Sequence, residues 1–254
     1  MYSPQQIKEL KSKEKIVMLT AYDYTLAKLM DNIVDLILVG DSMAMVVLGH
    51  KDTTKIKMSD LITATKSVST GAKNTLIIGD LPLGSYDNNE DALKNAIQFL
   101  QAGAHAVKIE SKPDIAKHIV QNNIPVMGHT GLTPQTITDF KVQGKNEENA
   151  KTILQESKDL ETAGCFSLVL ECIPNNLAKQ ITNSISIPTI GIGAGPDCDG
   201  QVLVTHDMLG LFDDFKPKFV KRFSNIGEEI KKAIQNYKNE VKEKKFPDDK
   251  HSFH

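Results

Sequence analysis

The stretch Leu36-Ile37-Leu38-Val39-Gly40-Asp41-Ser42 decides how this chain folds. It is a short apolar run, typical of a strand that is buried on both faces, and it ends abruptly in a glycine and a carboxylate. A helical pattern separates this run from the next apolar run, and the same order then repeats. Three later runs likewise end in an acid: Leu76–Asp80, Ala106–Glu110 and Leu168–Glu171.

Strands that alternate with helices predict an α/β fold whose parallel strands close into a (β/α)8 TIM barrel. The length of 254 residues fits one such domain. We therefore predict a single barrel domain over residues 1–254, with a C-terminal amphipathic helix over about 218–240 and a polar tail after it. Two long connections, 41–54 and 136–146, interrupt the pattern. Because connections of this length are uncommon unless they are functional, we expect the first to border the site.

Composition excludes several classes of protein. Lys and Arg total 30 against 32 Asp and Glu, a net charge of −2, so no basic face for nucleic acid is expected. Aromatic residues make up only 6%, and there is neither an apolar run long enough for a membrane span nor a secretory signal at Met1. Three cysteines (Cys165, Cys172, Cys198) lack metal-site spacing. We interpret them as reduced thiols of a cytoplasmic protein.

The acids at the strand ends predict a shared site. In a parallel barrel the C-terminal ends of the strands meet on one rim, so Asp41, Asp80, Glu110 and Glu171 are expected to face one another there. Any one of them could simply cap a turn, but four in series are harder to explain in that way. Like charges raise each other's pKa, so a hard divalent cation is expected among them.

Lys108 stands two residues before Glu110, and residues two apart on a strand share a face. An outward pair would be buried against apolar helices at considerable cost, whereas an inward pair places an ammonium beside the metal, ready for an anionic substrate. We predict the inward arrangement. His129 follows the apolar run 124–128, and two roles stay open for it: a hydrogen-bonding loop residue or a substrate contact. The glycines at 191–195 could cradle a phosphate, although a tight turn explains them sufficiently.

A series of sequence blocks between about residue 15 and residue 223 resembles, in order, the ketopantoate hydroxymethyltransferases (3-methyl-2-oxobutanoate hydroxymethyltransferases). The blocks are Met18–Asp23, Val39–Ser42, Met45–Gly49, Gly79–Pro82 with Gly84–Tyr86, Val107–Glu110, Gly128–Gln135, Ile190–Gly195 and Asp199–Val204. The chain departs from the family pattern at Ser111, where glycine is usual, and at Thr70, where arginine is common. Neither departure falls on one of the strand-end acids.

The resemblance implies a barrel of the phosphoenolpyruvate/pyruvate type, usually assembled as a homodecamer. It implies transfer of a hydroxymethyl group from 5,10-methylenetetrahydrofolate to 3-methyl-2-oxobutanoate, giving 2-dehydropantoate (ketopantoate), the first step of the pantothenate branch towards coenzyme A. Position by position, it implies these roles: Mg2+ at Asp41, Asp80 and Glu110; the oxoacid at Asp41, Ser42, Asp80 and Lys108; proton abstraction by Glu171.

Two other functions compete with this interpretation. A Mg2+-dependent C–C or P–C lyase on the same barrel has a similar placement of acids, but such enzymes generally carry a cysteine-bearing loop after the Glu110-type strand. None of the three cysteines falls there. A non-catalytic module that binds a phosphorylated ligand at residues 191–195 would not require four rim acids and a lysine. Oxoacid binding that needs Mg2+ would favour the enzyme, and Mg2+-independent phosphate binding would favour the module.

Overall fold

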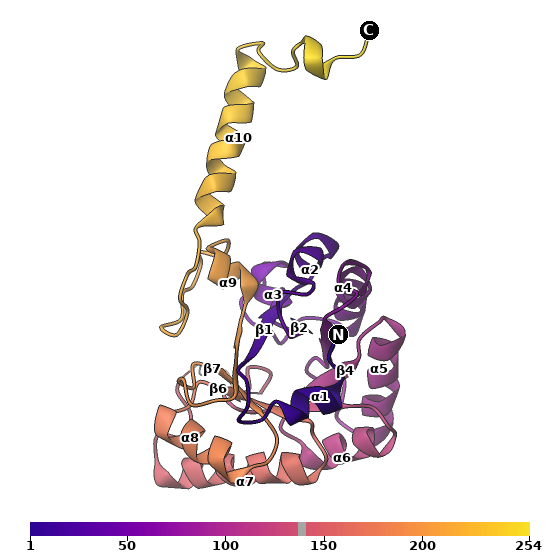
Figure 1. Cartoon of the computed structure of the whole chain (residues 1–254), viewed down its shortest axis with the longest axis vertical. Helices are drawn as coiled ribbons and strands as arrows, with labels where there is room; N and C mark the ends of the chain where they lie inside the picture. The colour runs from indigo at the N-terminus through magenta and orange to yellow at the C-terminus, as the bar shows by residue number, and fades with distance from the viewer. Residues whose placement is uncertain (137–140) are drawn as a thin grey trace. The chain divides into compact units, whose positions relative to one another are not determined.

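The computed structural model describes residues 1–136 and 141–254 (Figure 1). The chain divides into two compact units, Met1–Val204 and Thr205–His254. The first unit is a closed barrel of parallel strands in the order β1 to β8, which confirms the predicted (β/α)8 fold. The assignment of residues 1–254 to one domain stays a prediction.

The barrel strands are short, as the apolar runs predicted. They are β1 (Ile16–Thr20), β2 (Leu36–Val39), β3 (Leu76–Asp80), β4 (Ala106–Glu110), β5 (Val126–Gly131), β6 (Ser167–Glu171), β7 (Thr189–Ile192) and β8 (Gly200–Leu203). The helices of the first unit are α1 (Pro4–Glu9), α2 (Tyr24–Met30), α3 (Met43–Val46), α4 (Met58–Gly71), α5 (Asn89–Gln101), α6 (Pro113–Gln121), α7 (Glu147–Thr162) and α8 (Asn175–Ser184). The first predicted long connection thus contains the one-turn helix α3. Part of the second, residues 137–140, lies outside the described residues.

Successive residues of each strand face two different apolar clusters, because side chains alternate along a strand. Leu36 and Leu38 belong to the cluster inside the barrel, whereas Ile37 and Val39 belong to the cluster between strands and helices. Ile7 of α1 is fully buried in the inner cluster, so α1 contributes to the core at the barrel end where the strands begin. The apolar runs are continuous rather than alternating because both faces of the sheet are covered.

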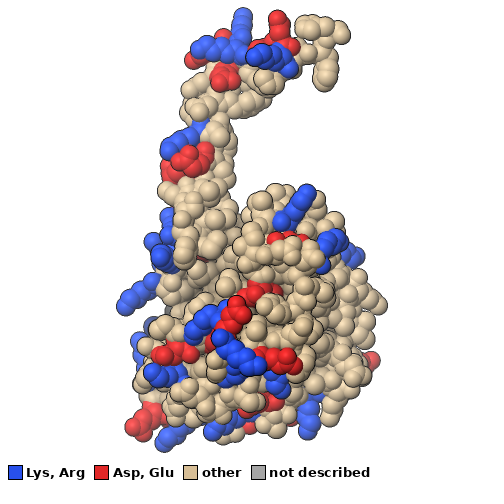
Figure 2. All heavy atoms as spheres, viewed as in Figure 1, with Lys and Arg blue, Asp and Glu red and all other residues tan. Residues whose placement is uncertain are grey.

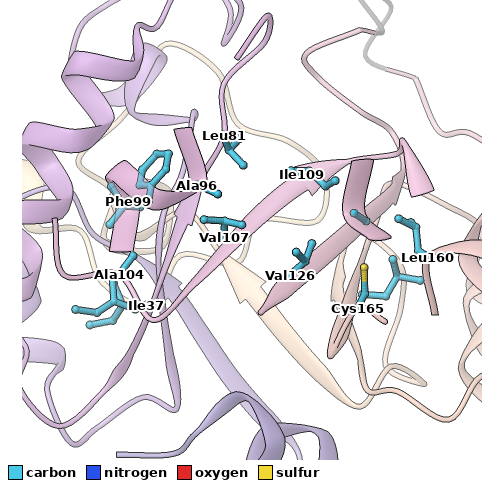
Figure 3. Packing of buried hydrophobic residues seen from close by; sticks show 14 of the residues in the cluster. Ile37, Leu81, Ala96, Phe99, Ala104, Val107, Ile109, Val126, Leu160 and Cys165 are labelled. Carbon is cyan, nitrogen blue, oxygen red and sulfur yellow. The ribbon is translucent and has the colours of Figure 1, made fainter. Parts of the chain in front are cut away.

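Phe99 of α5 shows how closely the helices approach the sheet (Figure 3). It is fully buried, and a Cβ added to Gly79 on β3 would lie 2.2 Å from its ring carbon Cδ1. Gly79 therefore provides the space in which the ring packs, and only a residue without a side chain fits at this position of β3.

The second unit contains α9 (Thr205–Leu209), α10 (Ile226–Lys242) and the short helix η1 (Asp249–His251). The terminal helix was predicted to begin near residue 218 but begins at Ile226, because Pro217 opens a turn in which its carbonyl accepts from the Val220 N–H. No residue of α10 is buried. Acidic and basic side chains are interspersed on the face drawn in Figure 2. Among the described residues, none of the helices is both long and apolar enough to cross a membrane.

Candidate active site

The predicted site residues converge at the C-terminal ends of the barrel strands, because the strand register aligns them. Asp80 on β3 pairs with Lys108 on β4, and Glu110 pairs with His129 on β5. Glu171 on β6 pairs with Gly131. His129 therefore lies within β5 rather than after it, since this strand continues to Gly131. Lys108 and Glu110 share the inner face with Ala106, which confirms the inward arrangement.

Lys108 and Asp80 form a buried ion pair. The Lys108 Nζ lies 2.7 Å from the Asp80 Oδ1, and the two side chains are 5% and 1% exposed. Burial disfavours the lysine charge, but Asp80, Glu110 and Asp41 outweigh that effect and raise the Lys108 pKa. Burial is also the largest influence on Asp80 and raises its pKa despite the neighbouring ammonium. The ion pair with Asp80 fixes the Lys108 ammonium group at the mouth of the barrel.

Asp41 follows β2 and is held beside Asp80. Its backbone N–H donates to the Asp80 Oδ2 over 3.2 Å, and its own Oδ2 accepts from the Gln135 Nε2 over 3.1 Å. Burial, followed by repulsion from Asp80, raises the pKa of Asp41 well above its usual range. The adjacent Ser42 shares a hydrogen bond of 2.8 Å between its Oγ and the Tyr22 hydroxyl. Two buried carboxylates thus lie side by side, and one lysine offsets part of their negative charge.

His129 lies between two acids. Its Nδ1 is 3.3 Å from the Glu110 Oε1 and its Nε2 is 3.4 Å from the Glu171 Oε2. Neither nitrogen makes a well-directed hydrogen bond to a described residue, so these contacts are mainly electrostatic. Burial and Lys108 oppose protonation, but the two carboxylates favour it and raise the pKa of His129 to about 9. For Glu110, burial alone would raise the pKa, but His129 and Lys108 outweigh this effect and lower the pKa overall.

Glu171 is the most accessible of the strand-end acids. Its side chain is 18% exposed, against 2% for Glu110. The backbone beside it is tightly packed: a Cβ added to Gly131, whose φ is +96°, would lie 2.4 Å from the Glu171 carbonyl oxygen. Gly131 therefore allows β5 to approach the end of β6 closely. The Glu171 side chain is thus accessible from the barrel mouth, while close packing against Gly131 holds its backbone in place.

The donor chemistry of the mouth fits a hard divalent cation. Asp41, Asp80 and Glu110 are each less than 10% exposed, and carboxylate oxygens are the ligands that Mg2+ prefers. In the part of the chain that the structure describes, no three His, Cys, Asp or Glu side chains converge on one point. Glu110 instead faces His129 and the Gln135 N–H. Asp41 and Asp80 suffice chemically, because Mg2+ is commonly held by one or two carboxylates with water and substrate completing its shell.

Two residues that the sequence pattern did not single out complete the site. Tyr86 donates its hydroxyl proton to the Gln135 Oε1 over 2.6 Å, and both side chains are buried. Gln135 is separated from Asp41 by 94 positions and from Tyr86 by 49. Both residues lie in blocks that carry the family resemblance, which was the only available signal. Their contacts arise because residues 132–136, directly after β5, lie against the strand-end acids.

The arrangement provides three chemical capacities: a fixed cation, a set of hard oxygen donors and a more accessible base. Lys108 can bind an anionic group, and Asp41 with Asp80 can bind a metal ion. Glu171 lies apart from these two acids and is the accessible carboxylate beside His129. Such a combination suits proton removal next to a carbonyl, where negative charge develops and must be stabilised.

Known proteins with similar sequences match the chain over most of its length. The family model of ketopantoate hydroxymethyltransferase matches residues 2–249. A 3-methyl-2-oxobutanoate hydroxymethyltransferase of Clostridium botulinum (strain Langeland) is 56% identical over 255 aligned positions, which cover 96% of this chain and 93% of that protein.

Solved structures share the barrel at low sequence identity. Phosphonopyruvate hydrolase is 10% identical with a TM-score of 0.67, and the match covers 100% of this chain and 92% of that one. A 2,3-dimethylmalate lyase, described as a PEP mutase/isocitrate lyase superfamily member, is 16% identical with a TM-score of 0.62, covering 100% and 93%. These structures establish the fold type, and the sequence matches establish the family. The chain belongs to the ketopantoate hydroxymethyltransferase family.

Proposed function

We propose that this chain transfers a hydroxymethyl group from 5,10-methylenetetrahydrofolate to 3-methyl-2-oxobutanoate and thereby forms 2-dehydropantoate. Its 56%-identical relative is named for this reaction. The observation that carries the proposal is the barrel mouth, where Lys108 and Asp80 form a buried pair 2.7 Å apart beside Asp41. A further carboxylate, that of Glu171, lies at the same rim and is more accessible.

Asp41, Asp80 and Glu110 would hold Mg2+ in this proposal, with Asp41 and Asp80 as the two acids that already lie together. The bound ion would act as a Lewis acid toward the keto and carboxylate oxygens of the oxoacid. The four carboxylates of the mouth outnumber its two cations, Lys108 and His129, which supports a divalent partner.

Side chains of this protein then bind the substrate, stabilise the developing charge and remove the proton. Lys108 binds the substrate carboxylate and offsets the charge that develops next to it. Ser42, beside Asp41, contributes to the oxoacid site. Glu171 removes the proton from C3 of the oxoacid, which leaves an electron pair on that carbon. Attack by this pair on the folate methylene forms the new C–C bond and breaks the bond from that carbon to one folate nitrogen. Water then replaces the second nitrogen and supplies the hydroxyl group, and tetrahydrofolate leaves with the protons from C3 and from water on its two nitrogens.

His129 faces Glu110 and Glu171 with its two ring nitrogens, so its direct neighbours are acids. We propose that it holds the Glu171 carboxylate in place. A direct substrate contact of His129 stays a prediction, and it would require one nitrogen to leave its acid. The mechanism above does not depend on that contact.

We further propose that the chain acts as a cytoplasmic homo-oligomer, a homodecamer by its family resemblance. Three free cysteines, of which Cys165 and Cys198 are buried, suit a reducing compartment. The exposed apolar side chains of α10 suit contact with another subunit.

An assay with Mg2+, methylenetetrahydrofolate and 3-methyl-2-oxobutanoate tests the proposal directly. We expect 2-dehydropantoate to form with Mg2+ and not after chelation of divalent ions, and calorimetry should show oxoacid binding that needs Mg2+. Oxoacid affinity that is the same with and without Mg2+ would contradict the metal-dependent mechanism. Release of inorganic phosphate from a phosphonate substrate would point instead to a P–C lyase.

A further inference from the structure

Gln135 has no role in the proposed mechanism, yet it makes hydrogen bonds to two of the acids that would hold Mg2+. Its backbone N–H donates to the Glu110 Oε2 over 3.1 Å. Its side-chain Nε2 donates to the Asp41 Oδ2 over 3.1 Å and to the Leu81 carbonyl over 3.0 Å. One residue thus joins an acid that follows β2 to an acid at the end of β4, and it is only 3% exposed.

The partners of the Gln135 amide fix its orientation. The Leu81 carbonyl can only accept a hydrogen bond, so the nitrogen must face it. The oxygen then faces the Tyr86 hydroxyl, which donates over 2.6 Å, and Tyr86 itself lies 3.4 Å from the Glu110 N–H. Both amide protons and the amide oxygen are therefore engaged, and rotating the amide by 180° would place like groups against each other at Leu81.

We propose that Gln135 is a positioning residue for the acids that would hold Mg2+, acting on Asp41 through its side chain and on Glu110 through its backbone N–H. The inference rests on the proposed function, because it assigns these two acids to the metal. Partners behind a metal ligand typically change metal affinity by about 10–100-fold when they are lost. Tyr86 acts one step further out, by holding the amide oxygen.

A purely structural role makes a different prediction. If Gln135 only filled space under the loop after β5, an apolar side chain of similar length would serve as well. The Tyr86 hydroxyl would then affect stability alone, and its effect would not depend on residue 135. Positioning requires instead that Tyr86 acts through Gln135, so that the two effects are not additive.

The test measures Mg2+ affinity by isothermal titration of the full-length protein without substrate, together with the melting temperature. We expect Gln135→Met to raise the Kd for Mg2+ about 10–100-fold. Tyr86→Phe removes one hydrogen bond and should raise the Kd about 2–10-fold. In the Tyr86→Phe/Gln135→Met double variant, we expect a Kd within about twofold of Gln135→Met alone.

Gln155→Met is the matched control, because Gln155 is exposed on α7 and its amide donates to the exposed Asp159 over 2.9 Å. This control should bind Mg2+ like the wild type. If Gln135→Met does not fold, Tyr86→Phe alone decides, since it retains the ring and removes one oxygen. An unchanged Kd in a folded Gln135→Met or Tyr86→Phe protein overturns the inference. A wild-type protein that binds no Mg2+ overturns the metal proposal as well, so the two failures are distinguishable.

Discussion

Glu171 differs from the other rim acids in access rather than in chemical type. It is 18% exposed and faces His129, whereas Asp80 is fully buried against Lys108. A carboxylate that must reach the substrate C3 cannot also be locked into a buried ion pair. The His129 Nε2, 3.4 Å from the Glu171 Oε2, orients the carboxylate. These properties support the proposal that Glu171 is the base.

Glu171→Gln retains the shape of the side chain and removes its basicity. We expect Mg2+ and oxoacid affinities close to those of the wild type, while exchange of the C3 proton into deuterated water slows by about 10²–10⁴-fold. NMR follows this exchange without folate and so isolates the first chemical step. Glu148→Gln, an exposed substitution on α7, is the control. Normal exchange in Glu171→Gln would assign the base to another group, and His129 would be tested next.

In the proposed function, Asp80 would connect metal binding with substrate binding. Its Oδ1 pairs with Lys108 and its Oδ2 accepts from the Asp41 N–H, so both groups depend on it. We expect Asp80→Asn to weaken Mg2+ binding and oxoacid binding together, each by about tenfold or more. Calorimetry measures both, with the exposed Asp159→Asn as control. Lost metal affinity with unchanged oxoacid affinity would show that the substrate docks without the metal.

At the scale of the element, the β-strand ends could be predicted because burial on both faces leaves continuous apolar runs, and the acids stand where those runs stop. The predicted positions of Asp41, Asp80, Glu110 and Glu171 at one rim follow from that pattern alone. Gln135 could not be found in this way, because it comes from a loop whose path is set by tertiary contacts. The end of β5 was also missed, since Gly131 and His129 do not resemble strand residues.

The contact of β3 with α5 gives a stability prediction at this scale. Gly79→Ala would place a Cβ 2.2 Å from the Phe99 ring, so strand or helix must shift. We expect the free energy of unfolding to fall by about 1–3 kcal/mol, measured from urea transitions. Adding Phe99→Leu should recover part of this loss, because the smaller side chain can move aside. Equal stability of Gly79→Ala and wild type would show that the ring does not need this glycine.

At the scale of the whole molecule, α10 has no buried residue, although its Tyr237 ring packs edge-on against Phe246 with 5.7 Å between the ring centroids. Ile226, Ile230, Ile234 and Tyr237 follow helical spacing on one face and are 36%, 45%, 61% and 60% exposed. A helix of 17 residues gains little stability from propensity alone and depends on packing of its apolar face. Ion pairs such as Lys231–Glu228, 2.8 Å apart and exposed, add little.

The apolar face of α10 predicts a contact with another copy of the chain. If another copy of the chain covers it in the proposed homo-oligomer, a charge at its centre must be buried without a partner when the subunits assemble. Ile234→Glu should therefore shift the mass measured by light scattering to a smaller species at micromolar concentration. Gln235→Glu adds the same charge at the next position, off this face, and should leave the mass unchanged. The same mass for Ile234→Glu and wild type would mean that α10 does not form the subunit contact, and the apolar face would then require another explanation.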